Sequence, residues 1–412
     1  MENVKSIEPD FSSSEVIQNI HENYDLLRQK RGSLYKSDNI LNGAWLVMGH
    51  EDIGNFLNDT EHLSSQRQAC LIMALPLELQ GQFEKLVNLH SQWFAYYDAP
   101  EHTKIRQVMA AGFTREFIQK FENEIADAVE VVLKHFSEKK IVNITEELAK
   151  KVPLITITAL FGVPLSDSRQ LSKWIDSIAA YMGSEKPDVR VIGAAQDSML
   201  EFQEYFKKLY DDRKKKRLGN DLLSRLIIAN TEDEILSVDE IFAQCTLIAF
   251  KGGEMTKNLI SNSIYLMLSE DGVKKELLND PKLIAKHIDE SIRFHSPIQY
   301  VGRMVKKDFD YNGSTLKEGD YVSIMLGAGN RDGSVHKNPH TFDIHRDAAP
   351  NYAFGTGMHE CIGQVIVKME ANVTLRLLLE KYPNIELAEE TKWRNNTGLR
   401  GLVSVKAKLN NR

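Results

Sequence analysis

Residues 354–363 read FGTGMHECIG and place one cysteine, Cys361, behind closely spaced glycines. Glycine has no Cβ atom, so the backbone of such a loop can approach a flat ligand closely. A helical pattern begins at Ile362, which predicts that Cys361 lies at a helix start, where backbone N–H groups favour a thiolate. A thiolate there would be a strong metal ligand. This stretch alone leaves open the alternative of a buried structural cysteine beside a glycine-rich turn.

Three charged patterns lie upstream of this loop. Residues 290–293 read ESIR, which puts Glu290 and Arg293 on one face of a helix. Arg346 supplies a further cation shortly before the cysteine. In residues 98–106, DAPEHTKIR, His102 and Arg106 are four residues apart and are predicted to project together.

Together these patterns resemble the cytochrome P-450 superfamily over nearly the whole chain. The resemblance implies a mainly α fold with a minor β component, and a haem b cofactor whose iron takes Cys361 as axial ligand. It implies that Glu290, Arg293 and Arg346 lock the cysteine loop in place through bidentate pairing. The cofactor-binding residues that it implies are His102, Arg106, Arg303, Phe354, Gly355, His359, Cys361 and Gly363. Among them, His102, Arg106, Arg303 and His359 match the family's contacts to the haem propionates.

The pattern over residues 237–270 predicts a long helix that begins with a Ser-x-Asp-Glu cap. Its middle, residues 251–256, reads KGGEMT and resembles the family's oxygen-activating helix, with Glu254 in the acid position. The paired glycines predict a bend or a close approach to a ligand. Met255 stands where the family has a relay threonine, and a thioether donates no hydrogen bond. Either Thr256 replaces it through a one-residue bulge, or a substrate hydroxyl or water does, or the reaction is not ordinary oxygen activation.

Lys251 is a second departure from the family pattern. Lys251, Glu254, Met255 and Asn258 are predicted to form one helical stripe, which by resemblance faces the distal side of the haem. An unpaired buried ammonium is costly, so three interpretations remain. Lys251 pairs with Glu254 or reaches water, or it anchors a substrate carboxylate, or it is a neutral amine near or on the iron. The candidate catalytic residues are therefore Glu254, Met255, Thr256 and Lys251.

Composition narrows the class of protein further. The 412 residues carry a net charge of −7, which argues against nucleic-acid binding. Three widely spaced cysteines, Cys70, Cys245 and Cys361, argue against a disulfide framework and favour a cytoplasmic location. We find no leader peptide and no apolar run of the ~18 residues that a membrane span needs. The expectation is one haem-binding domain over residues 1–412, with no fused reductase and no membrane anchor.

Hydrophobic periodicity predicts the remaining elements. Helices are expected over residues 14–30, 115–138, 142–162, 167–184, 194–217 and 362–382. Extended runs are expected at 33–36 and 44–48, and a β-ribbon from 309–311 to 321–325. Residues 327–363 form a loop-rich stretch that is too long for an ordinary connection. Candidate pocket segments, chosen by position, are residues 71–89, 177–184, 297–301 and 397–402.

The expected function is that of a haem-thiolate monooxygenase. It would hydroxylate or oxidatively couple a small to medium, mainly apolar organic substrate of secondary metabolism. A separate ferredoxin or flavodoxin with its reductase would supply the electrons. Met255 and Lys251 motivate a first rival, an enzyme of the same fold with peroxygenase or heteroatom-bond-forming chemistry. A second rival is a non-catalytic haem protein that binds a ligand.

Overall fold

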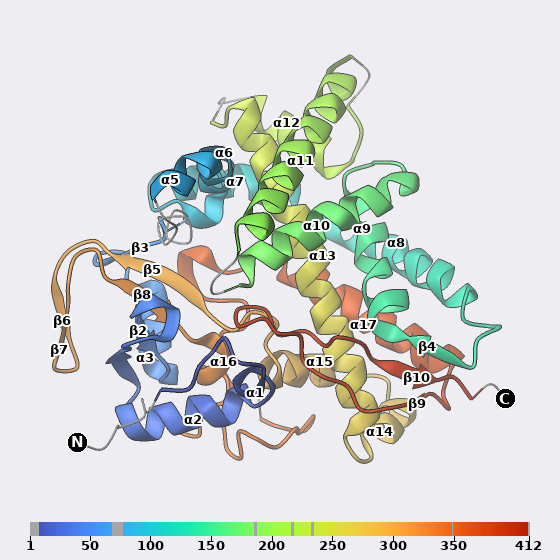
Figure 1. Ribbon diagram of the computed structural model, residues 1–412. Coiled ribbons are helices and arrows are strands. Elements are labelled where there is room, and N and C mark those ends of the chain that lie inside the picture. The colour runs from blue at the N-terminus through green and yellow to red at the C-terminus, as the bar shows by residue number, and fades with distance from the viewer. Residues whose placement is uncertain are drawn as a thin grey trace.

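The computed structural model describes residues 8–67, 77–184, 188–215, 218–231, 235–347 and 349–410. Helix α13 (Val238–Ser269) crosses the middle of the molecule, and α9, α10, α11, α15 and α17 pack against it (Figure 1). Ser237 caps α13 through the expected box: its hydroxyl accepts from the Glu240 N–H at 3.2 Å, and the Glu240 carboxylate accepts from the Ser237 N–H at 2.8 Å. Most side chains of α13 are buried, so this helix organises the core.

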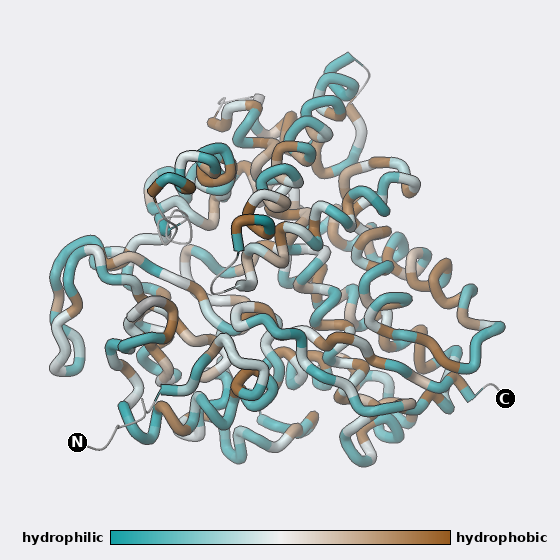
Figure 2. The backbone as a smooth tube through the Cα atoms, in the orientation of Figure 1, coloured by the Kyte–Doolittle hydropathy of each residue, from teal (hydrophilic) through white to brown (hydrophobic). Residues whose placement is uncertain are grey.

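The other helices surround α13 or the sheet beside it. Their bounds are α1 Ser14–Gln18, α2 Ile20–Arg31, α3 His50–Asn58, α5 Leu77–Gln80, α6 Glu84–Ser91, α7 Glu101–Gly112, α8 Arg115–Lys134, α9 Lys151–Leu160, α10 Ser168–Met182, α11 Val189–Lys215, α12 Leu222–Thr231, α14 Val273–Asn279, α15 Leu283–Phe294, α16 Leu326–Gly329 and α17 Gln364–Lys381. Apolar and polar residues alternate along their tubes because one face of each helix is turned inward (Figure 2). No helix of the described residues is long and apolar enough to cross a membrane.

A five-stranded sheet lies beside the helical part, in the order β1-β2-β8-β5-β3. Its strands are β1 Leu34–Lys36, β2 Trp45–Val47, β3 Leu63–Ser64, β5 Val301–Val305 and β8 Tyr321–Ile324. Strand β2 runs parallel to β8, and the other pairs are antiparallel. Gly43 precedes β2 with a φ of +81°, a conformation that glycine adopts readily. Strand β5 carries Arg303 opposite Val322, and the guanidinium donates from Nη1 to the Gly302 carbonyl at 2.9 Å.

Two sequence expectations are wrong because distant segments supply the strand partners. The helix expected over 142–162 begins instead as β4 (Ile141–Asn143), which pairs with β10 (Lys406–Lys408) in a sheet completed by β9 (Glu386–Leu387). The ribbon that starts with β6 (Phe309–Tyr311) returns immediately through β7 (Ser314–Leu316). The run expected as its second strand belongs to β8 of the large sheet.

Smaller differences concern helix continuity. The helix expected over 14–30 is divided at Asn19, whose backbone is not helical. Helix α13, by contrast, passes through its paired glycines without a break. A Cβ atom on Gly253 would lie 2.9 Å from Cδ1 of Ile175, so this glycine allows a close approach of helix α10. The close approach foreseen at this position is therefore to a neighbouring helix.

Candidate functional site

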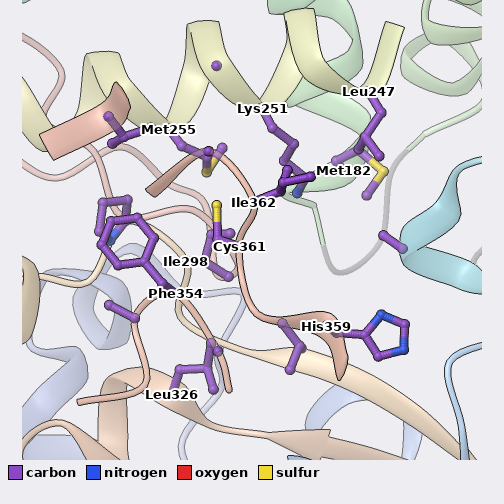
Figure 3. A pocket seen from close by; sticks show the side chains of 18 of the residues that line it. Met182, Leu247, Lys251, Met255, Ile298, Leu326, Phe354, His359, Cys361 and Ile362 are labelled. Atoms are coloured by element: carbon purple, nitrogen blue, oxygen red, sulfur yellow. The ribbon is translucent and has the colours of Figure 1, made fainter. Parts of the chain in front are cut away.

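A cavity of about 520 Å³ lies between α13 and the cysteine loop. Lys251 and Met255 extend from α13 toward it, and the sulfur of Cys361 points back toward α13 (Figure 3). Most of the remaining lining is apolar, including Leu247 and Met182. The lining also includes residues from three of the four segments chosen by position, namely Met182, Ser184, Pro297, Ile298, Tyr300, Val301, Gly398 and Leu399. The fourth segment, 71–89, contributes nothing from its described part, and residues 71–76 lie outside the described residues.

Cys361 is held by a tight loop just before α17. Its backbone N–H donates to the carbonyl of Phe354 at 2.9 Å, and Gly355 and Gly357 both adopt a φ of +69°. A Cβ atom on Gly357 would lie 2.2 Å from the Asn58 amide oxygen, so only glycine fits this turn.

The expected placement of Cys361 at the helix start needs correction, because α17 begins at Gln364 and its N-cap is Gly363. Burial raises the pKa of the Cys361 thiol above its ordinary value, against the opposing effects of the Gly363 N–H and of Lys251. The helix start alone therefore does not produce a thiolate here. A bound metal ion would, because it deprotonates a coordinating thiol.

The Glu290–Arg293 pair on α15 forms the anchor of the loop-rich stretch. Nε and Nη2 of Arg293 donate to the two carboxylate oxygens of Glu290, each at 2.7 Å, and both side chains are buried. Arg346 adds a third bond to Glu290 at 3.2 Å, and the Asp343 N–H adds a fourth at 3.0 Å. Both guanidinium groups also donate to backbone carbonyls of the stretch, namely those of Asn330, Lys337, Asn338, Pro339 and Thr341. The geometry is that of the lock expected from the resemblance.

Arg67, Arg303 and His359 line one edge of the cavity, and His102 lies beside His359 without lining it. The rings of His102, on α7, and His359, in the cysteine loop, lie 4.3 Å apart between centroids. Burial lowers the pKa of His102 to about 4 and that of His359 to about 2, so both imidazoles are neutral. Burial also lowers the pKa of Arg303 to about 9, and the neighbouring Arg67 adds to this effect. Positive charge is concentrated here, and an anion would be stabilised.

The donor set at this edge fits a haem. Among the residues that the structure describes, both ring nitrogens of His102 and Nη1 of Arg106 are buried without a hydrogen-bond partner. Buried polar groups are normally paired, so these atoms point to a bound group with acceptor oxygens. The propionates of a haem are such acceptors. His102 and Arg106 do not line the cavity themselves, but His359 and the Cys361 sulfur do. His359 is already engaged, because its Nε2 lies 2.9 Å from the Ser65 hydroxyl.

The distal helix does not present the four-residue stripe expected from its spacing. Lys251 and Met255 line the cavity, whereas Glu254 and Asn258 do not. Glu254 is turned aside by two ion pairs, to Lys257 at 2.5 Å and to Arg394 at 2.6 Å. These cations and the hydrogen bonds from them hold the pKa of the carboxyl below its usual value, although burial opposes them. The Lys251–Glu254 pair considered from the sequence is absent from the described ion pairs.

Thr256 does not take the position of the relay threonine. It does not line the cavity, and α13 runs through it as a regular helix without the bulge that this substitution needs. It lies beside the carboxyl group of Glu370 on α17. Burial raises the pKa of Glu370 to about 8, while the hydroxyls of Thr156 and Thr256 act in the opposite direction. Glu370 is therefore a neutral, buried carboxylic acid at neutral pH.

Glu370 makes the stability of the protein pH-dependent. Between about pH 4.5, where an unfolded glutamate titrates, and about pH 8, the folded chain retains a proton that the unfolded chain has released. Stability is therefore lost as the pH rises through this range. Glu370→Gln removes the effect, so its stability relative to wild type should increase by about 1–3 kcal/mol between pH 5 and pH 7. Urea unfolding at several pH values measures this difference. Glu380→Gln, at an exposed position of α17, is the control, and an equal slope in both variants would contradict the assignment.

Four residues of the site escaped the sequence analysis: Arg67, His90, Glu370 and Arg394. His90 and Arg67 line the cavity but lie far from any motif, in α6 and just after β3. Arg394 reaches Glu254 from a position 140 residues away in the sequence. Glu370 lies nine residues after Cys361 in the amphipathic helix α17. The signal that could have identified it is its acidic side chain in that helix.

The comparisons with known proteins identify the family. The family model described as Cytochrome P450 matches residues 12–410. The chain is 29% identical over 393 residues to the biotin biosynthesis cytochrome P450 of Bacillus subtilis, covering 95% of this chain and 96% of the relative. It is 30% identical over 355 residues to cytochrome P450(BM-1) of Priestia megaterium, covering 84% and 83% of the two chains.

Solved structures show the same fold. The crystal structure of P450BioI in complex with hexadec-9Z-enoic acid ligated acyl carrier protein matches with a TM-score of 0.88 at 28% identity, covering 96% of this chain and all of that one. The Bacillus subtilis bacillaene polyketide synthase cytochrome P450 PksS matches with a TM-score of 0.86 at 25% identity, covering 98% of this chain. With its cysteine loop, its locked Glu290–Arg293 pair and a match over nearly its whole length, the chain belongs to the cytochrome P450 family of haem-thiolate monooxygenases.

Proposed function

We propose that this protein holds haem b in the cavity between α13 and the cysteine loop and oxidises a small to medium organic molecule of secondary metabolism. One observation carries the proposal: His359 lines the cavity that contains the Cys361 sulfur, and beside it His102, with its ring 4.3 Å away, and Arg106 bury donors without partners in the described residues. Two relatives are named for biotin biosynthesis and polyketide biosynthesis, which supports a small to medium organic substrate. The mainly apolar lining supports a mainly apolar substrate.

In this proposal Cys361 is the axial ligand of the iron, and the bound haem supplies the oxidising chemistry of the family. His102, Arg106 and Arg303 would bind the propionates, and His359 would join them by exchanging its contact with the Ser65 hydroxyl. Phe354, Gly355 and Gly363 shape the loop around Cys361. The whole of residues 1–412 serves as one haem-binding domain. The absorption shift of the haem on titration with candidate compounds, followed by product analysis, tests this assignment.

Glu254 is the proposed distal acid, and its ion pairs define how it acts. Arg394 is partly exposed, so the Glu254–Arg394 pair connects the interior of α13 with solvent. Because Glu254 is turned away from the cavity, a water molecule or a substrate group must carry the proton past Met255. We propose that the bound substrate, or water ordered by it, provides the hydrogen-bonding group that the Met255 thioether lacks.

Restoring a hydroxyl at position 255 tests this dependence on the substrate. Met255→Thr should leave the product formed per electron consumed unchanged or lower, because the substrate or water already completes proton delivery. The measurement compares product, NADPH oxidised and hydrogen peroxide released in the two proteins. Met255→Leu is the matched control, since it keeps the apolar character of the site. A rise in coupling of about tenfold or more in the threonine variant would show that the wild-type relay is simply impaired, given the rate factors typical of acid–base assistance.

We further propose that a separate ferredoxin or flavodoxin with its reductase delivers electrons, in the cytoplasm where such carriers act. The resemblance to bacterial members of the family supports this partner class. Turnover with NADPH, a ferredoxin and its reductase should exceed turnover with hydrogen peroxide alone. Product formation with peroxide alone would favour the second candidate function, a peroxygenase, for which the apolar Met255 in the cavity wall is the specific observation.

A further inference from the structure

One corner of the cavity is basic, although the rest of its lining is mainly apolar. It is formed by Lys251 from α13, Arg67 from the segment after β3, and His90 from α6, and we call these three side chains the basic corner. Lys251 and Arg67 lie close enough to repel each other, and both also act on His90. Three segments far apart in the sequence therefore bring two positive charges and an imidazole to one place.

Lys251 has no carboxylate partner among the residues that the structure describes. Its ammonium nitrogen lies 5.0 Å from the centroid of the Phe250 ring, which is a weak contact for a buried cation. Burial, followed by the charge of Arg67, lowers the pKa of Lys251 to about 8. Lys257, on the same helix, is compensated as buried cations usually are, because its ammonium pairs with the Glu254 carboxylate at 2.5 Å. Lys251 is half-buried at the cavity wall, so an anion bound in the cavity would compensate its charge.

Arg67 and His90 present donors to the same corner. The guanidinium of Arg67 is oriented by a 3.0 Å bond from Nη1 to the Ser65 carbonyl and by the Tyr96 ring 4.8 Å away. No ion pair to Arg67 occurs within the described part of the chain. His90 is 3% exposed, and both of its ring nitrogens are buried without a partner in that part. Burial lowers the pKa of His90 to about 3, so the ring is neutral and offers one N–H donor.

The acidic residues of the cavity do not neutralise this corner. Glu370 is a neutral acid at neutral pH, because burial raises its pKa to about 8. The carboxylate of Glu360 accepts a hydrogen bond from Gln364 at 2.7 Å. Neither of them forms an ion pair with Lys251 or Arg67 in the described residues. The anion that compensates this corner must therefore come with a bound molecule. The haem propionates are assigned to His102, Arg106, Arg303 and His359, so the substrate is the candidate source.

We propose that the basic corner binds the carboxylate of the substrate, so that the substrate class of this enzyme is apolar organic acids. The carboxylate would lie between the Lys251 ammonium and the Arg67 guanidinium, with His90 as an additional donor, and the apolar body would fill the rest of the cavity. Charge-assisted hydrogen bonds of this kind are the strong ones in a water-poor site. Because Lys251 stands one turn before Met255, the same carboxylate would order water beside the missing relay hydroxyl. This inference rests on the proposed function, whose site it deepens.

Matched pairs of acids and esters test the proposal. The probes are straight-chain and aryl-terminated alkanoic acids of eight to sixteen carbons and their methyl esters, titrated into the haem-loaded protein by calorimetry and by the absorption shift. Wild type should bind at least one acid about tenfold more tightly than its ester. Lys251→Met, which keeps the side-chain length without the charge, should weaken that acid roughly 30-fold or more, because it removes one partner of a buried charge pair. The affinity for the ester should change by less than about threefold.

Two further variants separate charge from shape. Lys251→Arg should retain most of the affinity for the acid, and Leu247→Met, on the same face of α13, should affect acid and ester alike. Equal affinity for acid and ester in wild type, or no binding of any acid in the series, overturns the proposal. A third result also overturns the proposal: the resting wild-type protein shows the absorption spectrum of a nitrogen-ligated iron, and Lys251→Met abolishes it. The Lys251 amine would then lie on the iron. The haem site itself is tested separately, by the absorption band of the reduced protein with carbon monoxide, so failure of this inference is distinguishable from failure of the proposed function.

Discussion

Cys361→His will lose the absorption band that reduced, carbon monoxide-treated protein shows when a thiolate ligates the haem iron. The wild-type protein should show this band at full intensity. Cys361 is the described cysteine whose sulfur lies in the cavity, facing α13 across the space that would contain the haem. Imidazole is a neutral ligand and cannot donate charge as a thiolate does, so the band should disappear completely rather than weaken.

Cys245→Ala is the matched control for this experiment. Cys245 is a fully buried free cysteine of α13 that does not line the cavity. Its replacement should leave the thiolate band intact. A Cys361→His protein that keeps the band, or a Cys245→Ala protein that loses it, would show that another cysteine ligates the iron. Haem content should be measured in each variant, so that loss of the band is distinguished from loss of the cofactor.

The second large effect is expected at the Glu290–Arg293 pair. Glu290→Ala leaves Arg293 and Arg346 without their common carboxylate, and Arg293 is almost fully buried. Removing one partner of a buried pair costs about 3–5 kcal/mol of folding free energy. Because both guanidinium groups hold the stretch that leads to Cys361, the loss should also abolish haem retention. Haem content per chain and the urea midpoint measure the two effects.

The neighbouring Asp289 offers a control in the same turn of helix. Asp289 pairs with Lys368 at 2.8 Å, but both side chains are exposed, so Asp289→Ala should cost less than about 1 kcal/mol. Glu290→Gln keeps the shape and part of the hydrogen bonding, and it should lie between wild type and Glu290→Ala if the alanine variant fails to fold. Normal haem content in Glu290→Ala would mean that the pair contributes no more than a surface ion pair does.

Local sequence signals predicted those features whose determinants lie close together in the chain. The glycines around residue 355, the cap at Ser237, and the Glu290–Arg293 spacing act over a few residues, and the structure confirms each of them. The family fold and the cysteine loop were therefore accessible from the sequence. Strand β4 was misjudged because its partner β10 lies more than 200 residues away, and β8 because it lies between β5 and the equally distant β2.

The partners of charged residues were decided by the tertiary structure alone. The helical spacing along α13 predicts that Glu254 and Lys251 both face the cavity. In the structure, Glu254 pairs with Lys257 and with the distant Arg394 and does not line the cavity, whereas Lys251 does. Burial likewise raises the pKa of Glu370, and it leaves both ring nitrogens of His90 without partners in the described residues. Neither effect follows from residues within one helical turn. The sequence by itself determined the family fold and the geometry of the cysteine loop, because both depend on short-range geometry. The packing of distant segments determined which charges are compensated, because desolvation and ion pairing depend on neighbours in space rather than in the chain.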